Sequence, residues 1–206
     1  MKKTYKLSWL ASASIATYAI IAVASDIFAN KMLNIYGLAL AGGILLVPFS
    51  FTIRDVMHKL IGFENAKRVV WATAIINLAI AALLMLLDIM PSAVSGQDEL
   101  WHQVMGSSWR IIIASFIAQV AADLMDTYVF EYFTRRLHGK KTWLRVVGSN
   151  LISTPIDSML FTLIAFLGVL PMDVMVNSII SSTIVKFVIS LFAIPLAYAH
   201  ESKEIE

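Results

Sequence analysis

The sequence predicts an all-α, polytopic membrane protein with six transmembrane helices in a single domain over residues 1–206. Hydrophobic residues make up 59% of the chain and charged residues only 15%, and the mean hydropathy of +0.77 is outside the range of a soluble globular protein. The apolar residues gather in runs of about twenty, which is the length of a helix that crosses the hydrocarbon layer. The basic residues concentrate in alternate loops, as they do in multi-pass membrane proteins.

Six apolar runs are expected to cross the membrane, at residues 7–28, 38–53, 69–87, 111–130, 146–170 and 174–199. The first run follows a basic start and contains Ala22-Val23-Ala24, so a cleaved signal peptide is the alternative to its retention as a helix. The second run is the shortest, and Gly42-Gly43 and Pro48 predict a broken or kinked helix there. The polar stretch 88–110 is interpreted as a loop because it is rich in turn-forming residues.

The basic residues also predict the orientation of the chain. They precede the first run and follow the second, fourth and sixth runs, whereas the other loops hold only Lys31 and Arg110. Because cytoplasmic loops carry the excess of lysine and arginine, we expect a protein of the inner membrane with both termini in the cytoplasm. The lipid bilayer is then its first partner.

Polar residues within or at the ends of the runs are candidate binding residues, since a charge in the hydrocarbon layer is costly unless it is paired or wetted. Asn30 and Asp55 end the first and second runs. The spacing of Gln119, Asp123 and Asp126 places them on one face of a helix. Asn150 and Asp157 are seven residues apart and share a face as well, and Lys186 is a cation deep within the sixth run.

For two of these residues, a structural role is the alternative to a role in binding. Lys186 needs a carboxylate partner, either Asp126 or Asp157, and such a pair either locks two helices together or takes part in binding. Asp55 either pairs with the adjacent Arg54 or contributes to the site.

Other chemistry finds no support in the sequence. The chain has no cysteine, and it contains neither a metal-binding His-Glu-x-x-His helix nor a nucleophile elbow. The segment Gly139-Lys140-Lys141-Thr142 is not a phosphate-binding loop, because Thr134 stands where the first glycine is required. The net charge of +2 is too small to indicate nucleic-acid binding. We therefore expect no catalytic residue, metal or cofactor, and a carrier of a small polar molecule rather than an enzyme.

Two stretches resemble the queuosine-precursor transporter family, also called the vitamin-uptake-transporter-like family. The first stretch begins at Ala29-Asn30-Lys31 and continues through residues 41–48, Arg54-Asp55-Val56, Gly62 and residues 66–71. The second comprises residues 110–118, 126–130, 139–145 and 156–166. The resemblance extends from about Asp26 to Lys186.

The resemblance implies a six-helix inner-membrane importer, similar in fold to the substrate-binding subunits of energy-coupling-factor transporters but working without their ATPase. The implied cargo is 7-cyano-7-deazaguanine or 7-aminomethyl-7-deazaguanine, salvaged for tRNA modification. Carboxylates can accept the two N–H groups of a guanine-like edge, and amides or a lysine can donate to its carbonyl. The residues expected to bind it are Asp126, Asp157, Asp55, Asn30, Gln119, Asp123, Asn150 and Lys186.

The sequence also departs from the family pattern, because Asp26, Lys59, Asp123 and Thr154-Pro155 stand where other residues are expected. Additional carboxylates would favour a cationic ligand, so another small polar solute is an alternative cargo. Two further alternatives are a substrate-binding subunit of an ATP-driven vitamin or nucleobase uptake complex and a membrane scaffold with no cavity.

Overall fold

The computed structural model describes residues 8–136 and 142–201 of the chain. Lys2, Lys3, Lys6, Lys140, Lys141 and Lys203, on which the expected orientation partly rests, lie outside these residues, as does residue 7 of the first expected span. The elements in chain order are α1 (Trp9–Phe28), β1 (Met32–Ile35), β2 (Leu38–Ala41), the 3₁₀ helix η1 (Gly42–Leu46), α2 (Val47–Ile61), α3 (Phe63–Ile89), α4 (Gln97–Met105), α5 (Ser108–Arg136), α6 (Thr142–Phe166) and α7 (Met172–Glu201).

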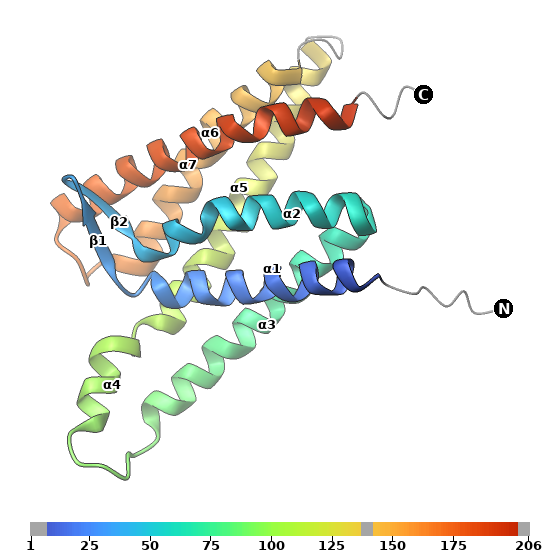
Figure 1. Cartoon of the computed structure of the whole chain (residues 1–206). Helices are drawn as coiled ribbons and strands as arrows, with labels where there is room; N and C mark the ends of the chain where they lie inside the picture. Colours follow the sequence, from blue (N-terminus) through green and yellow to red (C-terminus); the bar gives the residue numbers. More distant parts are fainter. Residues whose placement is uncertain (1–7, 137–141, 202–206) are drawn as a thin grey trace.

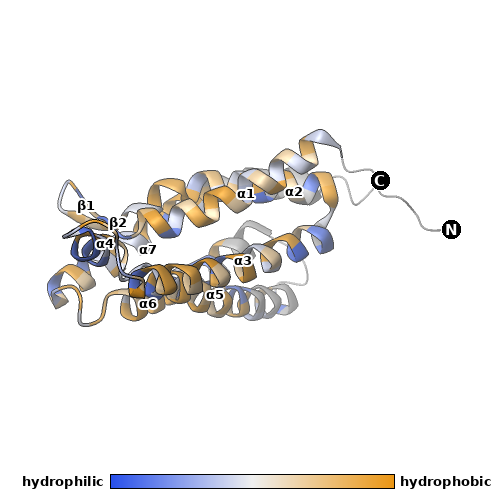
Figure 2. Cartoon of the chain, turned by 90° about the horizontal axis from the view of Figure 1, so that it is seen from below, coloured by the Kyte–Doolittle hydropathy of each residue, from blue (hydrophilic) through white to orange (hydrophobic). Residues whose placement is uncertain are grey.

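The chain is a mostly helical, multi-pass membrane protein. Within the described residues, five helical segments are long and apolar enough to cross a membrane: Trp9–Phe28, Glu64–Ile89, Gln97–Asp126, Val147–Phe166 and Met172–Leu191. Figure 2 shows hydrophobic residues along most of each long helix and hydrophilic residues near the start of α3. Large apolar side chains such as Ile75 and Leu83 on α3 are more than half exposed in the isolated chain, as lipid-facing residues are.

The second expected span differs from the structure. Only its residues from Val47 onward are α-helical, because Leu38–Ala41 forms a strand and Gly42–Leu46 forms η1. The two strands pair antiparallel, with Ile35 opposite Leu38, and Tyr36-Gly37 makes the turn between them with φ of 52° and 86°. Positive φ at both turn residues matches the right-handed twist of a two-residue hairpin. A short apolar run was thus partly strand, which helical periodicity alone did not distinguish.

The β1–β2 hairpin is attached to α7 by one amide side chain. Asn177 accepts the backbone N–H of Ala39 at 2.8 Å and donates to the carbonyl of Gly37 at 3.0 Å. Ser181, one turn further along α7, donates to the same Asn177 oxygen at 2.9 Å. These bonds satisfy backbone groups that a two-stranded sheet leaves open, and they hold the hairpin at one end of the bundle.

The stretch 88–110, expected to be a loop, contains the short helix α4. Gly96 precedes the helix with φ of 81°, and Asp98 and Glu99 lie in its first turn, where acidic residues favour a helix start. His102 of α4 bonds Asp88 at the end of α3 at 2.8 Å. Of the residues interpreted as turn formers, Pro91-Ser92 and Ser95-Gly96 lie outside the helices. Gln97-Asp98-Glu99, interpreted as part of the same turn, instead form the first turn of α4.

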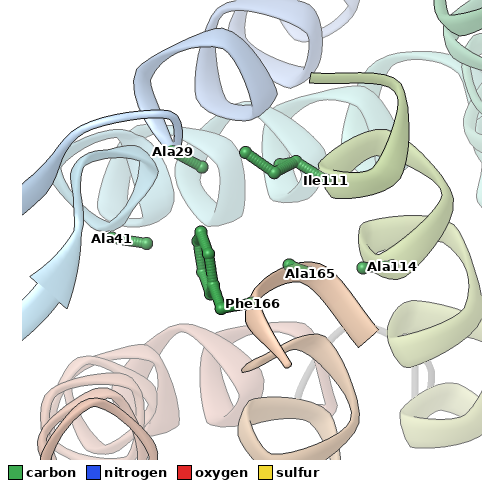
Figure 3. Close-up of a cluster of buried hydrophobic side chains, with 6 residues drawn as sticks. All are labelled: Ala29, Ala41, Ile111, Ala114, Ala165 and Phe166. Carbon is green, nitrogen blue, oxygen red and sulfur yellow. The ribbon is translucent and has the colours of Figure 1, made fainter. Parts of the chain in front are cut away.

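A small apolar core joins the hairpin base to the bundle. Figure 3 shows Phe166, at the end of α6, pointing toward Ala29 and Ala41, with Ile111 and Ala114 of α5 nearby. Arg110 closes the same end of α6 by donating to the carbonyls of Ile164 at 2.6 Å and Leu167 at 2.8 Å. This cation at a helix C-terminus satisfies carbonyls that have no partner within the helix.

The long helices run back and forth between the two ends of the molecule. The start of α1 and the end of α7 lie at the same end, and the hairpin, α4 and the α6–α7 connection lie at the other (Figure 1). The pairs α5–α6 and α6–α7 pack most extensively. Residues of α1, α2, α3, α5, α6 and α7 line a common cavity between these helices.

Gly42 and Gly43 let η1 approach the end of α1. A Cβ at Gly42 would meet the Phe28 carbonyl, and one at Gly43 would meet the Ser25 carbonyl and lie 2.7 Å from its Oγ. Ser25 Oγ in turn donates to the Gly43 carbonyl at 3.1 Å. The glycine pair predicted a helix interruption, and in the structure these glycines begin η1, where the lack of a Cβ permits the close approach to α1.

Gly43→Ala is expected to destabilise the protein by about 1–3 kcal/mol, because the added methyl must push η1 away from α1. The measurement is the midpoint of thermal unfolding of the purified protein in detergent. The matched control is Gly96→Ala, where φ is 81° but nothing lies within 4 Å of the new Cβ, so that only backbone strain is added. A midpoint for Gly43→Ala equal to that of the intact protein would contradict the close-approach explanation.

Candidate functional site

A cavity of about 320 Å³ lies inside the helical bundle and receives side chains from all the long helices. Six of the eight residues expected to bind a ligand line it: Gln119, Asp123, Asp126, Asn150, Asp157 and Lys186. They come from three consecutive helices, α5, α6 and α7. A scaffold without a cavity, one of the alternatives, does not agree with this finding.

The polar stripe of α5 forms one wall of the cavity. Gln119, Asp123 and Asp126 all line it, which confirms that their four- and three-residue spacing places them on one face. Asp126 accepts a hydrogen bond from Ser153 of α6 at 3.4 Å. Asp123 lies close enough to Asp126 and Asp157 to interact with both electrostatically. Three carboxylates are thus concentrated between α5 and α6.

Lys186 of α7 binds Asp157 of α6, with 2.7 Å between Nζ and Oδ2. The expectation that Lys186 requires a carboxylate partner is confirmed, and Asp157 is that partner. The Lys186 ammonium also lies 5.9 Å from the centre of the Phe161 ring. Both charged side chains keep about a fifth to a quarter of their surface exposed, and both line the cavity. The pair therefore joins two helices and still presents a donor and an acceptor to a ligand.

Arg54 of α2 is the second cation of the cavity. It interacts electrostatically with Asp123 across the cavity, and its guanidinium lies 5.7 Å from the ring centre of Phe51. The adjacent Asp55 lies in α2, but its side chain is outside the described part of the chain, so its pairing with Arg54 stays a prediction. Arg54 is not among the eight residues expected to bind a ligand, although it lines the cavity.

Asp26 of α1 also lines the cavity, although it is not among the eight residues expected to bind a ligand. Its Oδ2 accepts from the Asn77 amide of α3 at 2.9 Å, and Ser115 of α5 hydrogen-bonds the same carboxylate. Tyr18, two turns earlier in α1, also lines the cavity and is hydrogen-bonded to Gln119. The four-residue spacing of Tyr18, Ala22 and Asp26 is the signal that could have revealed this face.

Asn30 is not among the residues that line the cavity. Its amide donates to the Ile27 carbonyl at 3.0 Å at the end of α1, and its oxygen accepts from Ser108 at the start of α5 at 3.0 Å. Through these contacts the Asn30 side chain connects the end of α1 to the start of α5.

The cavity has the size and lining of a small-molecule site. Its volume is near the lower end of the usual range for ligand pockets, about 300–1,000 Å³. The rings of Phe51 and Phe161 offer apolar faces, and the amides and charged groups offer hydrogen bonds to a polar edge. Among the side chains that the structure describes, no group of three His, Cys, Asp or Glu is arranged to hold a metal ion.

Fold and cavity together define a multi-pass helical membrane protein with a polar cavity inside its bundle. The chain belongs to the family described as "putative vitamin uptake transporter", whose model matches residues 41–200. The resemblance found in the sequence is thereby confirmed.

Three curated relatives are similar to the chain. A "probable queuosine precursor transporter" of Bacillus subtilis is 28% identical over 86% of this chain and 78% of its own length. A "queuosine precursor transporter" of Escherichia coli is 27% identical over 71% of this chain and 64% of its own length. A "probable queuosine precursor transporter" of Haemophilus influenzae is 30% identical, with 60% of this chain aligned to about half of the relative. No solved structure matches the chain.

Proposed function

We propose that this protein imports a queuosine precursor, 7-cyano-7-deazaguanine or 7-aminomethyl-7-deazaguanine, for salvage into tRNA. The observation that carries the proposal is the polar cavity lined by all the long helices, in a chain whose relatives are named queuosine precursor transporters. A 7-deazaguanine is a flat, polar bicycle, and the cavity combines aromatic faces with carboxylates and amides. The function requires no chemical reaction, so no residue is assigned a catalytic role.

The Asp157–Lys186 pair matches the hydrogen-bonding face of a guanine-like ring. That face presents two N–H donors beside a carbonyl acceptor. The free lone pairs of Asp157 can accept from the N–H groups, and Lys186 can donate to the carbonyl. Phe161, which the Lys186 ammonium approaches at 5.9 Å, is placed to pack on the ring. Gln119, Asn150 and the carboxylates of α5 complete the polar wall, and Asp55 stays a predicted contributor.

The proposed topology is six spans in the inner membrane with both termini in the cytoplasm. η1 and α2 are continuous and together extend about 32 Å, at about 2.0 Å and 1.5 Å per residue, which suffices for the sixth crossing. The start of α1 and the end of α7 lie at the same end of the molecule, which supports an even number of crossings (Figure 1). The lysines and arginines that follow α2 and α5 support the cytoplasmic assignment of that end.

The proposed importer acts without an ATPase partner, as the resemblance to its family implies. The alternative is a substrate-binding subunit of an ATP-driven complex. The two differ in a simple measurement, because a subunit would copurify with a membrane scaffold and ATPases and lose uptake when they are deleted.

The intact chain is expected to restore queuosine to tRNA in a bacterium that lacks precursor synthesis and its own importer, grown with limiting 7-aminomethyl-7-deazaguanine. Asp126→Ala is expected to lower that queuosine at least about tenfold, because the cavity loses one of its carboxylates. The measurement is mass spectrometry of digested tRNA, with membrane levels of each variant determined by immunoblot.

The control for this experiment is Asp173→Asn, which removes a carboxylate from the exposed start of α7, outside the cavity. It is expected to restore queuosine like the intact chain. The proposed cargo would be refuted if the intact chain, present at normal membrane levels, restored queuosine to tRNA with neither precursor.

Single cysteines are expected to react according to the six-span topology, because the natural chain has none. In spheroplasts, a membrane-impermeant maleimide should label Ser95→Cys, between α3 and α4, and should label Ser202→Cys only after permeabilisation. The unmodified chain provides the background. Labelling of Ser202→Cys in intact spheroplasts would contradict the cytoplasmic C-terminus.

A further inference from the structure

The cavity is lined by more acidic than basic side chains. Among the described residues that line it are four carboxylates but only two cations: Asp26, Asp123, Asp126 and Asp157 against Arg54 and Lys186. A low-dielectric site with excess negative charge attracts a cation and disfavours a neutral ligand whose polar end is an acceptor. The imbalance therefore bears on which precursor the cavity accepts.

Two of the carboxylates already have cationic partners. Lys186 binds Asp157 at 2.7 Å, and Arg54 interacts with Asp123. A third carboxylate, Asp26, is only 7% exposed and is bound at 2.9 Å by the neutral Asn77 amide. Asp26 is therefore enclosed by its own neighbours rather than presented to a ligand.

Asp126 is the carboxylate that can still accept hydrogen bonds from a ligand. Among the described side chains its partner is the neutral hydroxyl of Ser153 at 3.4 Å, near the limit of a hydrogen bond, and no cation lies within ion-pair distance. Asp123, three residues earlier on the same face, adds like charge. A ligand cation beside Asp126 would gain a charge-assisted hydrogen bond and relieve this repulsion.

The position of Asp126 relative to Asp157 suits a ligand that has two polar ends. Asp126 contacts Ser153, which precedes Asp157 by four residues, or about one turn, on α6. A ring whose hydrogen-bonding face meets the Asp157–Lys186 pair can thus extend a substituent toward Asp126. Of the two precursors, one carries a primary amine on that substituent, which is protonated at neutral pH as in lysine, and the other carries an uncharged nitrile.

We propose that Asp126 is a specificity determinant that binds the ammonium group of the cargo, so that this protein prefers the aminomethyl precursor to the nitrile precursor. The inference rests on the proposed function and adds charge selection to it. The nitrile nitrogen only accepts hydrogen bonds and would face the lone pairs of a carboxylate, which offers no donor. The preference consequently depends on the charge of Asp126 and not on the shape of the cavity alone.

The test is competition for uptake of radiolabelled 7-aminomethyl-7-deazaguanine by cells that express the chain, with each unlabelled precursor as competitor. For the intact protein, half-inhibition by the aminomethyl compound is expected at a concentration about tenfold lower than by the nitrile. Asp126→Asn should weaken binding of the aminomethyl compound more than that of the nitrile and bring the ratio close to one. Asp126→Glu, which keeps the charge, should preserve a ratio in favour of the aminomethyl compound.

The control Asp173→Asn should keep the ratio of the intact protein, since this carboxylate lies outside the cavity. Uptake of both precursors with equal half-inhibition by the intact protein would overturn the inference and leave the proposed function standing. An unchanged ratio in Asp126→Asn would also overturn it. If Asp126→Asn does not reach the membrane, the ratios of the intact protein and of Asp126→Glu decide. Uptake of neither precursor would refute the proposed function itself.

Discussion

The pairing of Lys186 with Asp157 is the interaction on which the site depends. An ammonium group within the hydrocarbon layer must be neutralised or wetted, and here a carboxylate of the next helix does so at 2.7 Å. The pair also remains partly exposed to the cavity rather than sealed between α6 and α7. A partner that stabilises a charge within the bundle can thus also serve a ligand, because a carboxylate has more lone pairs than one lysine uses.

Small residues and one amide hold the hairpin close to the bundle. The chain leaves α1, makes the hairpin and returns as η1, and only glycines at 42 and 43 permit the return so close to α1. Ala29, Ala41 and Phe166 fill the space beneath the hairpin (Figure 3), and Asn177 fixes the hairpin to α7. Non-helical backbone is tolerated at the edge of the membrane because these neighbours satisfy its polar groups.

The membrane class and six of the residues that line the cavity could be predicted from the sequence, because both depend on local spacing. Apolar runs of helical length marked the long helices, and the spacing of Gln119, Asp123 and Asp126 placed them on one face. The hairpin did not follow, since four apolar residues fit a strand or a helix and the bonds to Asn177 come from a segment almost 140 residues away. Asn30 was assigned to the site because a polar residue at a span end does not reveal which way it points, and it bonds helix ends instead.

The most direct test of the account asks whether the Lys186–Asp157 pair binds cargo as well as joining two helices. The thermal midpoints of the intact protein, Asp157→Asn and Asp157→Asn/Lys186→Gln are measured in detergent with and without saturating 7-aminomethyl-7-deazaguanine. The account predicts a lower midpoint for the single variant, because Lys186 loses its partner, and recovery of most of that loss in the double variant. It also predicts that the precursor raises the midpoint of the intact protein but not of the double variant. A double variant that regains stability and responds to the precursor like the intact protein would contradict the account and make the pair purely structural.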